Sequence, residues 1–377
     1  MTSEPKQLVG TYEPAEAGPG KLRSAEANYQ PRSRDMTIAS RVASALGLRG
    51  GETVLIRSAT NGSATRGIDH VNQVEAVDGL PPDERLERKR FDELTAIDPK
   101  TRLAFETCGG PVSMRVIDLL TPIGFGQRGL IVAPPRTGKT VLLQQMAAGV
   151  AANHPNVYMM VLLIDERPEE VTDMRRTVRG EVVASSNDQN VASHVRIARL
   201  ILEKAKRMVE IGKDVIVLLD SLTRLGRAFN AHMEGGRRIM SGGLDVRALA
   251  EPKSMFGAAR NCEEGGSLTI MASCLIETGS RMDDVIFNEF KGTGNMEIVL
   301  SREPANRRVF PALDLSQSGT RKEELLIPAE WLNVSHQIRR KMLDQPPSRA
   351  IERLTEAMAK FADNEMFVKG YVGRPML

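Results

Sequence analysis

The stretch APPRTGKT, Ala133 to Thr140, decides the fold of this chain. It follows the apolar run Gly129–Val132 and leads into VLLQQMAAGVAA, so a buried strand, a loop and a helix come in that order. In such a P-loop, the backbone N–H groups of the loop and of the helix N-terminus converge on phosphates. Lys139 then offers positive charge to the β- and γ-phosphates, and Thr140 offers a hydroxyl to Mg²⁺. Although Ala133 stands where the pattern has glycine, the stretch predicts a nucleoside triphosphate site.

The P-loop stands within an alternation of apolar runs and helical segments. Helical periodicity is clearest from His194 to Ile211. Buried strands that alternate with helices predict an α/β fold, in which a mainly parallel sheet is covered on both faces. The apolar runs that we expect to form its strands are Gly129–Ala133, Val157–Ile164, Val215–Leu219 and Leu268–Leu275.

Two of these runs end in carboxylates. VYMMVLLIDER ends at Asp165 and Glu166, and DVIVLLD ends at Asp220. Because the carboxyl ends of parallel strands face the ligand crevice, we expect both near the P-loop. Asp220 suits the acid that holds Mg²⁺, and Glu166 suits the group that orients and deprotonates the attacking water.

An arginine is also expected to stabilise the charge that develops during phosphoryl transfer. The residues alone do not choose among the candidates, which are Arg167, Arg224, Arg227, Arg307, Arg308 and Arg321.

Length, charge and cysteine content limit the domain number, the kinds of partner and the localisation that we expect. The 377 residues suggest two or three domains, and the net charge of 51 − 48 = +3 is too small to argue for nucleic acid by itself. No apolar run is long enough to span a bilayer, and MTSEPKQLVG does not read as a secretory signal. Three widely spaced cysteines predict reduced thiols, so we expect a cytoplasmic protein with no membrane partner.

The N-terminal part has a different pattern. Residues 1–35 are rich in Glu, Pro, Gly, Ser and Ala, and could form a disordered tail or short strands. Strands are predicted at Glu52–Arg57 and Ile68–Val77, with an NGS turn between them, which together favour a small β-barrel. The charged run PPDERLERKRFDEL predicts a solvated connector helix. We therefore expect a β module at 1–80, a connector at 81–112 and an ATPase domain at 113–377 that ends in helices around 346–367.

Long runs in the second half resemble the Rho family, whose members are hexameric RNA-dependent helicases that terminate bacterial transcription. The resemblance extends from about residue 113 to 330. The runs that carry it are GQRGLIVAPPRTGKTVLLQQMA, VLLIDERPEEVTDMRRTVRGEVVASS, DVIVLLDSLTRLGRAFN, FGAARNCEEGGSLTI, FKGTGNMEIVLSR and SGTRKEELL.

The resemblance implies a RecA-like ATPase domain and a role for each matching residue. Glu166 is implied as the water-activating base, Asp220 as the Mg²⁺ aspartate and Arg321 as an arginine finger from the neighbouring subunit. Arg308 matches a second arginine near the nucleotide, and Phe310 and Val141 would flank the adenine. The implied P-loop residues are Pro135, Arg136, Thr137, Gly138, Lys139 and Thr140.

Two RNA-gripping loops of the central pore are also implied by the resemblance. The first spans about His232 to Leu244, and the second is ETGSR, Glu277 to Arg281. The residues expected to contact RNA are Arg238, Ser241, Gly242, Gly243, Thr278, Gly279 and Arg281.

The implied protein is a homohexamer that uses ATP and Mg²⁺ to move 5′ to 3′ along single-stranded RNA and to act on the RNA polymerase elongation complex. One rival is a rotary or export-type ring ATPase, which needs no nucleic acid. Another is an RNA-binding ring that has lost or altered termination. A DNA recombinase is disfavoured, because SGTRKEELL and the β module do not suit it.

The N-terminal module departs from the family. Members carry an OB-like barrel with aromatic side chains that stack RNA bases, and here Pro19, Lys21 and Thr37 stand at those positions. Since each stacked base contributes roughly 1–3 kcal/mol, we expect a weak or altered primary RNA site. Lys21, Arg23, Arg32 and Arg34 could keep phosphate contacts. The RNA preference and the resting state of the ring stay open.

Overall fold

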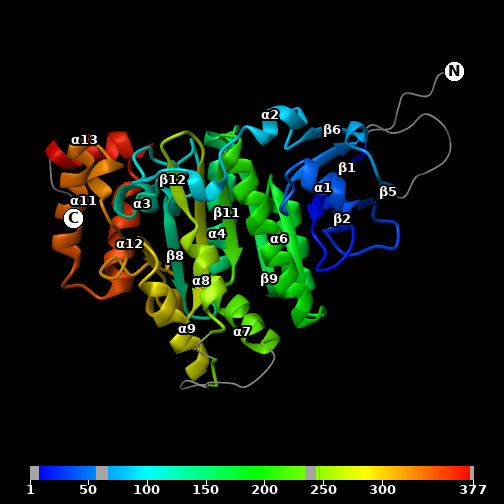
Figure 1. Cartoon of the computed structure of the whole chain (residues 1–377). Helices are drawn as coiled ribbons and strands as arrows, with labels where there is room; N and C mark the ends of the chain where they lie inside the picture. Colours follow the sequence, from blue (N-terminus) through cyan, green and yellow to red (C-terminus); the bar gives the residue numbers. More distant parts are fainter. Residues whose placement is uncertain (1–7, 57–66, 234–242, 246, 374–377) are drawn as a thin grey trace. The chain divides into compact units, whose positions relative to one another are not determined.

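The structure is a computed structural model that describes residues 8–56, 67–233, 243–245 and 247–373. The chain divides into two compact units, and Figure 1 shows both. The first unit comprises residues 1–95, 195–213 and 263–266, and the second comprises 96–194, 214–262 and 267–377. The predicted segments 1–80, 81–112 and 113–377 stay a prediction.

The first unit contains a six-stranded sheet that curls into a half-barrel, in the order β5-β3-β2-β1-β4-β6. All neighbouring strands are antiparallel except β3 and β5, which are parallel. Its strands are β1 (Leu8–Glu13), β2 (Gly20–Arg23), β3 (Thr37–Ile38), β4 (Thr53–Ile56), β5 (Gly67–Ile68) and β6 (Val74–Val77), with helix α1 (Ser40–Ala45) between β3 and β4.

Of the two alternatives for residues 1–35, the described residues 8–35 show short strands, because they form β1, β2 and the short helix η1 (Ala25–Ala27). One expectation for this unit needs correction. The predicted strand Ile68–Val77 is instead β5, the 3₁₀ helix η2 (Val71–Gln73) and β6. Pro19 lies just before β2, so the ladder between β2 and β3 loses no donor there. The predicted NGS turn lies outside the described residues.

The charged connector is also different from the expected solvated helix. Its helix α2 (Pro82–Leu86) is short, and η3 (Phe91–Glu93) follows it. Arg85 and Phe91 are buried. Arg85 ion-pairs with Asp78 at 2.8 Å and with Glu210 at 2.5 Å, so partners far along the chain turn a charged segment inward.

The second unit is built on a mainly parallel sheet. The strand order is β10-β9-β11-β13-β8-β14-β15, and β12 (Arg260–Cys262) and β7 (Ala96–Ile97) extend from β13. The pairs from β10 through β14 are parallel, as the apolar runs predicted. The strands are β8 (Arg128–Ala133), β9 (Tyr158–Glu166), β10 (Glu181–Ser186), β11 (Asp214–Asp220), β13 (Ser267–Leu275), β14 (Met296–Val299) and β15 (Gly319–Thr320).

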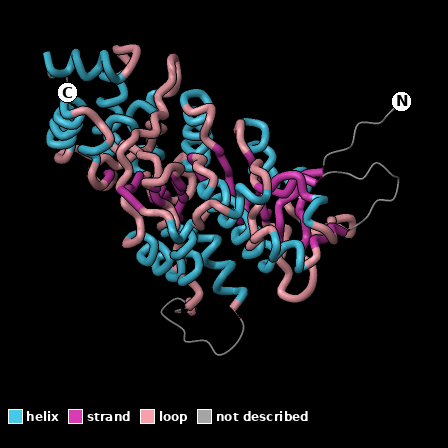
Figure 2. The backbone as a smooth tube through the Cα atoms, turned by 45° about the horizontal axis from the view of Figure 1, so that its top comes forward, coloured by secondary structure: helices cyan, strands magenta, loops and turns pink. Residues whose placement is uncertain are grey.

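Helices surround the strands of this sheet, as Figure 2 shows. The C-terminal helices gather at one end of the unit (Figure 1). The helices predicted around 346–367 are α12 and α13. The helices are α3 (Val112–Leu120), α4 (Lys139–Asn153), α5 (Pro168–Thr177), α6 (Val191–Glu210, assigned from 195 onward to the first unit), α7 (Leu222–His232), α8 (Ala250–Gly257), α9 (Arg281–Lys291), α10 (Arg302–Asn306), the 3₁₀ helix η4 (Glu323–Leu325), α11 (Ala329–Met342), α12 (Pro347–Met358) and α13 (Asn364–Gly373).

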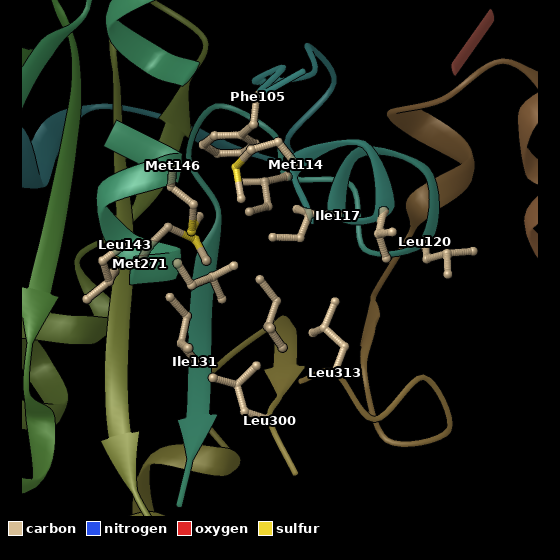
Figure 3. Close-up of a cluster of buried hydrophobic side chains, with 14 of the residues drawn as sticks. Phe105, Met114, Ile117, Leu120, Ile131, Leu143, Met146, Met271, Leu300 and Leu313 are labelled. Carbon is tan, nitrogen blue, oxygen red and sulfur yellow. The ribbon is translucent and has the colours of Figure 1, made fainter. Parts of the chain in front are cut away.

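A single apolar core holds the P-loop strand in place. Ile131 of β8 lies among Leu143 and Met146 of α4 and Ile117 of α3, with Met271 of β13 beside it (Figure 3). Each of these side chains is almost completely buried. Burying an aliphatic side chain of this size contributes about 1.5–3 kcal/mol, so the strand and helix that flank the P-loop are firmly fixed.

Candidate active site

The P-loop connects the end of β8 with the first turn of α4. Two of its residues have positive φ angles, Arg136 at 68° and Gly138 at 89°. The Thr137 hydroxyl donates to the Pro134 carbonyl at 2.7 Å and closes the loop from inside. The backbone thereby takes the sharp turn that leaves the N–H groups at the start of α4 available to phosphate oxygens.

Lys139 lies between the two predicted carboxylates. Its Nζ is 2.5 Å from Oδ1 of Asp220 and 3.5 Å from Oε1 of Glu166. Glu166 ends β9 and Asp220 ends β11, and these strands are neighbours in the sheet. The three residues that the sequence predicted for phosphate, metal and water are therefore brought together at one edge.

Glu166 is in an electrostatically unusual position. Burial, together with the negative charge of Asp220, raises the pKa of its carboxyl to about 7, although Lys139 and Arg224 act in the opposite direction. Arg224 lies 3.3 Å from Oε2, an atom that accepts no hydrogen bond within the described structure. A carboxyl with a pKa near neutrality and an open acceptor suits a general base for water.

Asp220 is buried and is held by a residue that the sequence analysis missed. The Ser273 hydroxyl, on β13, donates to Asp220 Oδ1 at 2.7 Å. Mg²⁺ keeps several of its waters and needs only one or two protein ligands besides the phosphates. The Asp220 carboxylate and the Thr140 hydroxyl would therefore be enough to hold a Mg²⁺ ion that binds together with ATP. The described residues contain no group of three or more His, Cys, Asp or Glu side chains for a metal of their own.

A cavity of about 540 Å³ continues from the P-loop. Val141 and Phe310, the predicted adenine neighbours, both line it and both are about half exposed. Arg136, Thr137 and Gly138 of the P-loop also line it. The remaining lining residues, which no motif marked as part of this site, are Pro111, Val112, Ser113, Leu142, Gln145, Leu300, Pro311 and Ala312.

Arg321 lies at the opposite end of β8 from the P-loop. Its N–H donates to the Asn295 carbonyl, and the N–H of Asn295 donates to the carbonyl of Arg128, the first residue of β8. Burial, along with the guanidinium groups of Arg260 and Arg321, lowers the pKa of Arg128, which also places Arg321 at this end. Since a strand rises about 3.3 Å per residue, roughly 16 Å of β8 separates Arg128 from Ala133.

The other arginine candidates have separate positions. Arg308 is exposed and has a φ of 62°. Arg224 is the candidate that approaches Glu166 within the chain. Arg227 instead pairs with Asp283 on α9.

The predicted RNA loops are only partly within the described residues. Arg238, Ser241 and Gly242 lie outside them, and Gly243 is exposed. In the second loop Thr278 donates to Asp283 at 2.6 Å, and Arg281 begins α9 and is exposed. Gly279 has a φ of 78°, a conformation that favours glycine.

The half-barrel exposes no Phe, Tyr or Trp side chain. The sequence gives the first unit only Tyr12, Tyr29 and Phe91, and all three are buried. Lys21 and Thr37, at the expected stacking positions, are cross-strand partners of β2 and β3. Arg23 is ion-paired with Glu13 and Asp35, so the suggestion that it contacts phosphate is not supported.

Comparisons with known proteins place these features in a family. Residues 113–320 match the ATP synthase alpha/beta family, nucleotide-binding domain. Proteins named transcription termination factor Rho are 49% identical in Cereibacter sphaeroides (95% of this chain, 85% of that one) and 48% in Aquifex aeolicus (96% and 84%). The Bacillus subtilis protein of the same name is 49% identical over 90% of this chain and 79% of its own.

The similar solved structures include two secretion ATPases, and they show the fold alone. One is a prototypical ATPase from the type III secretion system of pathogenic bacteria, with a TM-score of 0.62 and 21% identity over 75% of this chain and 87% of its own. Another is an assembled type III secretion ATPase of enteropathogenic E. coli with its central stalk, with a TM-score of 0.58 and 21% identity over 74% and 73%. Among the described residues, no helix has the length and apolarity needed to cross a bilayer.

Proposed function

The chain belongs to the family of transcription termination factor Rho, RNA-dependent ATPases of the RecA-like class, and we propose that it hydrolyses ATP between its own subunits to move along single-stranded RNA. The proposed assembly is a homohexameric ring, and the proposed target is the RNA polymerase elongation complex. Thr278, Gly279 and Arg281 would contact RNA in the pore, together with Gly243 and the predicted residues of the first loop, Arg238, Ser241 and Gly242.

The chemistry follows from the charges around Lys139. When ATP binds, Lys139 exchanges Asp220 for the β- and γ-phosphates, and the freed carboxylate of Asp220 is available to Mg²⁺. Mg²⁺ neutralises phosphate charge when it is bound. Glu166 accepts a proton from the attacking water, for which Oε2 has an open acceptor site. Val141 and Phe310 hold the base at the other end of the cavity.

The observation that carries the subunit-interface proposal is the position of Arg321. A finger at the start of β8 cannot reach phosphates bound beyond its end, because the strand itself separates them by roughly 16 Å. Arg321 would therefore serve the P-loop of a neighbouring copy, and Arg308 would stand near the same interface. A head-to-tail contact of this kind closes into a ring when the rotation permits.

A second candidate is a ring of this family with weakened or altered termination. The burial of Tyr12, Tyr29 and Phe91 favours it, because the half-barrel then has no exposed Phe, Tyr or Trp on which bases could stack. The export-type ATPases share the fold of this chain, and at 21% identity the similarity supports no shared function.

The deciding experiment compares ATPase rates without RNA and with poly(C), poly(U) and poly(A), with Lys139→Ala as the control. An ATPase rate that RNA raises in the parent but not in Lys139→Ala supports the RNA motor. Hydrolysis that depends on Lys139 but ignores every RNA would reject the motor and favour a nucleic-acid-independent ring ATPase.

A further inference from the structure

Strand β9 contains an extra residue immediately before Glu166. Ile164 of β9 pairs with Ser185 of β10, and Glu166 pairs with Ser186, so Asp165 has no partner in β10. Asp165 also has a φ of 56°, in the left-handed region that few residues other than glycine, asparagine and aspartate adopt. An unpaired residue with this backbone is a β-bulge, and bulges beside active sites turn side chains in a new direction.

The bulge changes the face of the sheet on which Glu166 lies. Side chains alternate between the two faces of a strand, so in a regular strand Glu166 would share the face of Ile164. Ile164 is level with Ser185, whose hydroxyl lies 2.7 Å from Nδ1 of His194 on α6, so this face is the one that α6 covers. The inserted residue moves Glu166 to the opposite face.

The opposite face is the one that the P-loop helix covers. Leu163, which alternation places on that face of β9, belongs to the apolar core that contains Leu143 and Met146 of α4. Lys139, the first residue of α4, has its Nζ 3.5 Å from Oε1 of Glu166. If Glu166 lay on the α6 face, this contact could not form, because the sheet itself would separate the two side chains.

The charges around the bulge agree with this division. Burial lowers the pKa of His194, and the carboxylate of Asp165 acts on that pKa in the opposite direction, so Asp165 is within electrostatic reach of α6. The charged neighbours of Glu166 instead include Asp220 and Lys139. Two consecutive acidic residues therefore serve different sides of the sheet.

We infer that Asp165 is a positioning residue for ATP hydrolysis, and that its left-handed backbone, rather than its carboxylate, aims Glu166 at the nucleotide. The inference rests on the proposed role of Glu166 as general base and adds what places that base. Activity then depends on the backbone that the residue at position 165 tolerates. Glycine and asparagine adopt a positive φ readily, alanine adopts it at some cost, and a β-branched residue such as valine hardly adopts it at all.

The test measures ATPase turnover of the full chain at saturating ATP, with the homopolymer RNA that stimulates the parent most. Asp165→Gly and Asp165→Asn should keep most of the parent's kcat. Asp165→Ala should lose roughly 5- to 30-fold, the penalty of a left-handed backbone for an ordinary side chain. Asp165→Val should lose about 10²–10⁴-fold, the contribution of a general base. KM for ATP should stay the same in all four, because the P-loop and the base-binding cavity are unchanged.

Two further readouts separate a misdirected Glu166 from general damage to the fold. In the parent, kcat/KM should rise with pH as the Glu166 carboxyl, which has a pKa of about 7, ionises. The residual rate of Asp165→Val should lose this rise, as that of Glu166→Gln should. Asn28→Val is the matched control, since it puts the same side chain at a φ of 52° in the half-barrel. It should lower the free energy of unfolding and keep both kcat and its pH dependence.

Three outcomes would overturn the inference. Asp165→Asn and Asp165→Gly as inactive as Asp165→Val would mean that the carboxylate itself is needed. Parent-like turnover in Asp165→Val beside a slow Glu166→Gln would mean that the bulge aims nothing. If Asp165→Val does not fold, equal rates in Asp165→Ala and Asp165→Gly overturn the inference, and a slower Asp165→Ala supports it.

The proposed function can fail separately. If Glu166→Gln turns over like the parent, Glu166 is not the base, and its positioning by Asp165 is rejected together with that role. If no RNA stimulates the parent, the RNA motor is rejected, and the same variants compared by their RNA-free turnover still decide what Asp165 does.

Discussion

The catalytic cluster and the half-barrel cluster both gather opposite charges around buried carboxylates, but only in the half-barrel cluster does every carboxylate oxygen accept a hydrogen bond. The half-barrel cluster consists of Arg49, Asp78, Arg85, Arg207 and Glu210. Glu210 accepts from Arg49 at 2.6 Å, from Arg85 at 2.5 Å and from the N–H of Phe91 at 2.9 Å. The catalytic cluster consists of Lys139, Glu166, Asp220 and Arg224, and in it Glu166 Oε2 accepts no hydrogen bond within the described structure.

The difference distinguishes charged residues that stabilise the fold from charged residues that bind a ligand or take part in catalysis. Buried carboxylates that accept several donors have nothing left to offer a ligand, whereas a buried acceptor without a donor costs free energy and persists where function needs it. Perturbed carboxyls of this kind gather at active sites. The comparison therefore predicts that variants of the catalytic cluster lower turnover without lowering stability, whereas variants of the half-barrel cluster lower stability.

The largest effect is expected from Arg321→Ala. An arginine finger is worth about 10³–10⁵ in turnover, so the variant should be almost inactive. Mixing it with Lys139→Ala should recover activity, because about a quarter of the interfaces in a mixed ring then join an intact P-loop to an intact finger. Steady-state ATPase assays of the single and mixed proteins measure this. Parent-like turnover in Arg321→Ala, or a mixture as inactive as its components, would contradict the role of Arg321 as an arginine finger for the neighbouring subunit.

Glu166→Gln should lower kcat by about 10²–10⁴, the usual contribution of a general base. Because the carboxyl has a pKa of about 7 and acts as the anion, kcat/KM of the parent should rise as pH rises through 7. The variant should lose this dependence, and Glu169→Gln on the exposed start of α5 should keep it. A parent profile that is flat between pH 6 and 8 argues against Glu166 as the base.

The same variant should stabilise the protein at alkaline pH. Folding raises the pKa of Glu166 from 4.5 to about 7, so its carboxyl favours the folded state when protonated, and this contribution is lost as pH rises from 4.5 through 7. Glu166→Gln removes that loss and should raise the free energy of unfolding at pH 8 by on the order of 1–2 kcal/mol. Denaturant unfolding at pH 5 and pH 8 measures the difference.

Arg85→Met should destabilise the half-barrel by about 3–5 kcal/mol, because Asp78 and Glu210 are left buried without that guanidinium. Denaturant unfolding monitors the loss. Arg88→Met is the matched control three residues along the chain, since its pair with Glu84 is exposed and worth roughly 0–1 kcal/mol. If both variants lose the same free energy of unfolding, the burial of the ion pairs does not determine how much they stabilise the fold.

The smallest effect is a gain of RNA affinity. Lys21→Phe with Thr37→Tyr places two aromatics side by side on β2 and β3, where each stacked base should contribute about 1–3 kcal/mol. Binding of a cytosine-rich oligonucleotide should tighten, whereas Lys21→Leu with Thr37→Val should change little. No gain over the aliphatic control means that this face does not meet RNA.

The sequence predicted those elements whose local hydrophobic pattern matches their position in the fold. Buried parallel strands such as β9 and β11 are continuous apolar runs, and their terminal carboxylates met Lys139 as expected. Strand β10 (Glu181–Ser186) was missed because EVVASS lies at the sheet edge and has no strong apolar run. The inward turn of Arg85 could not be predicted, because its partner Glu210 lies 125 positions away.

With Arg321 as the proposed finger, its placement at the start of β8 would give each chain one half of two active sites. A newly made, solitary chain would then have a P-loop and a finger that cannot meet, and it should leave the ATP around it untouched. Turnover per chain should then fall steeply on dilution, and hydrolysis becomes a direct report of how many neighbours have assembled.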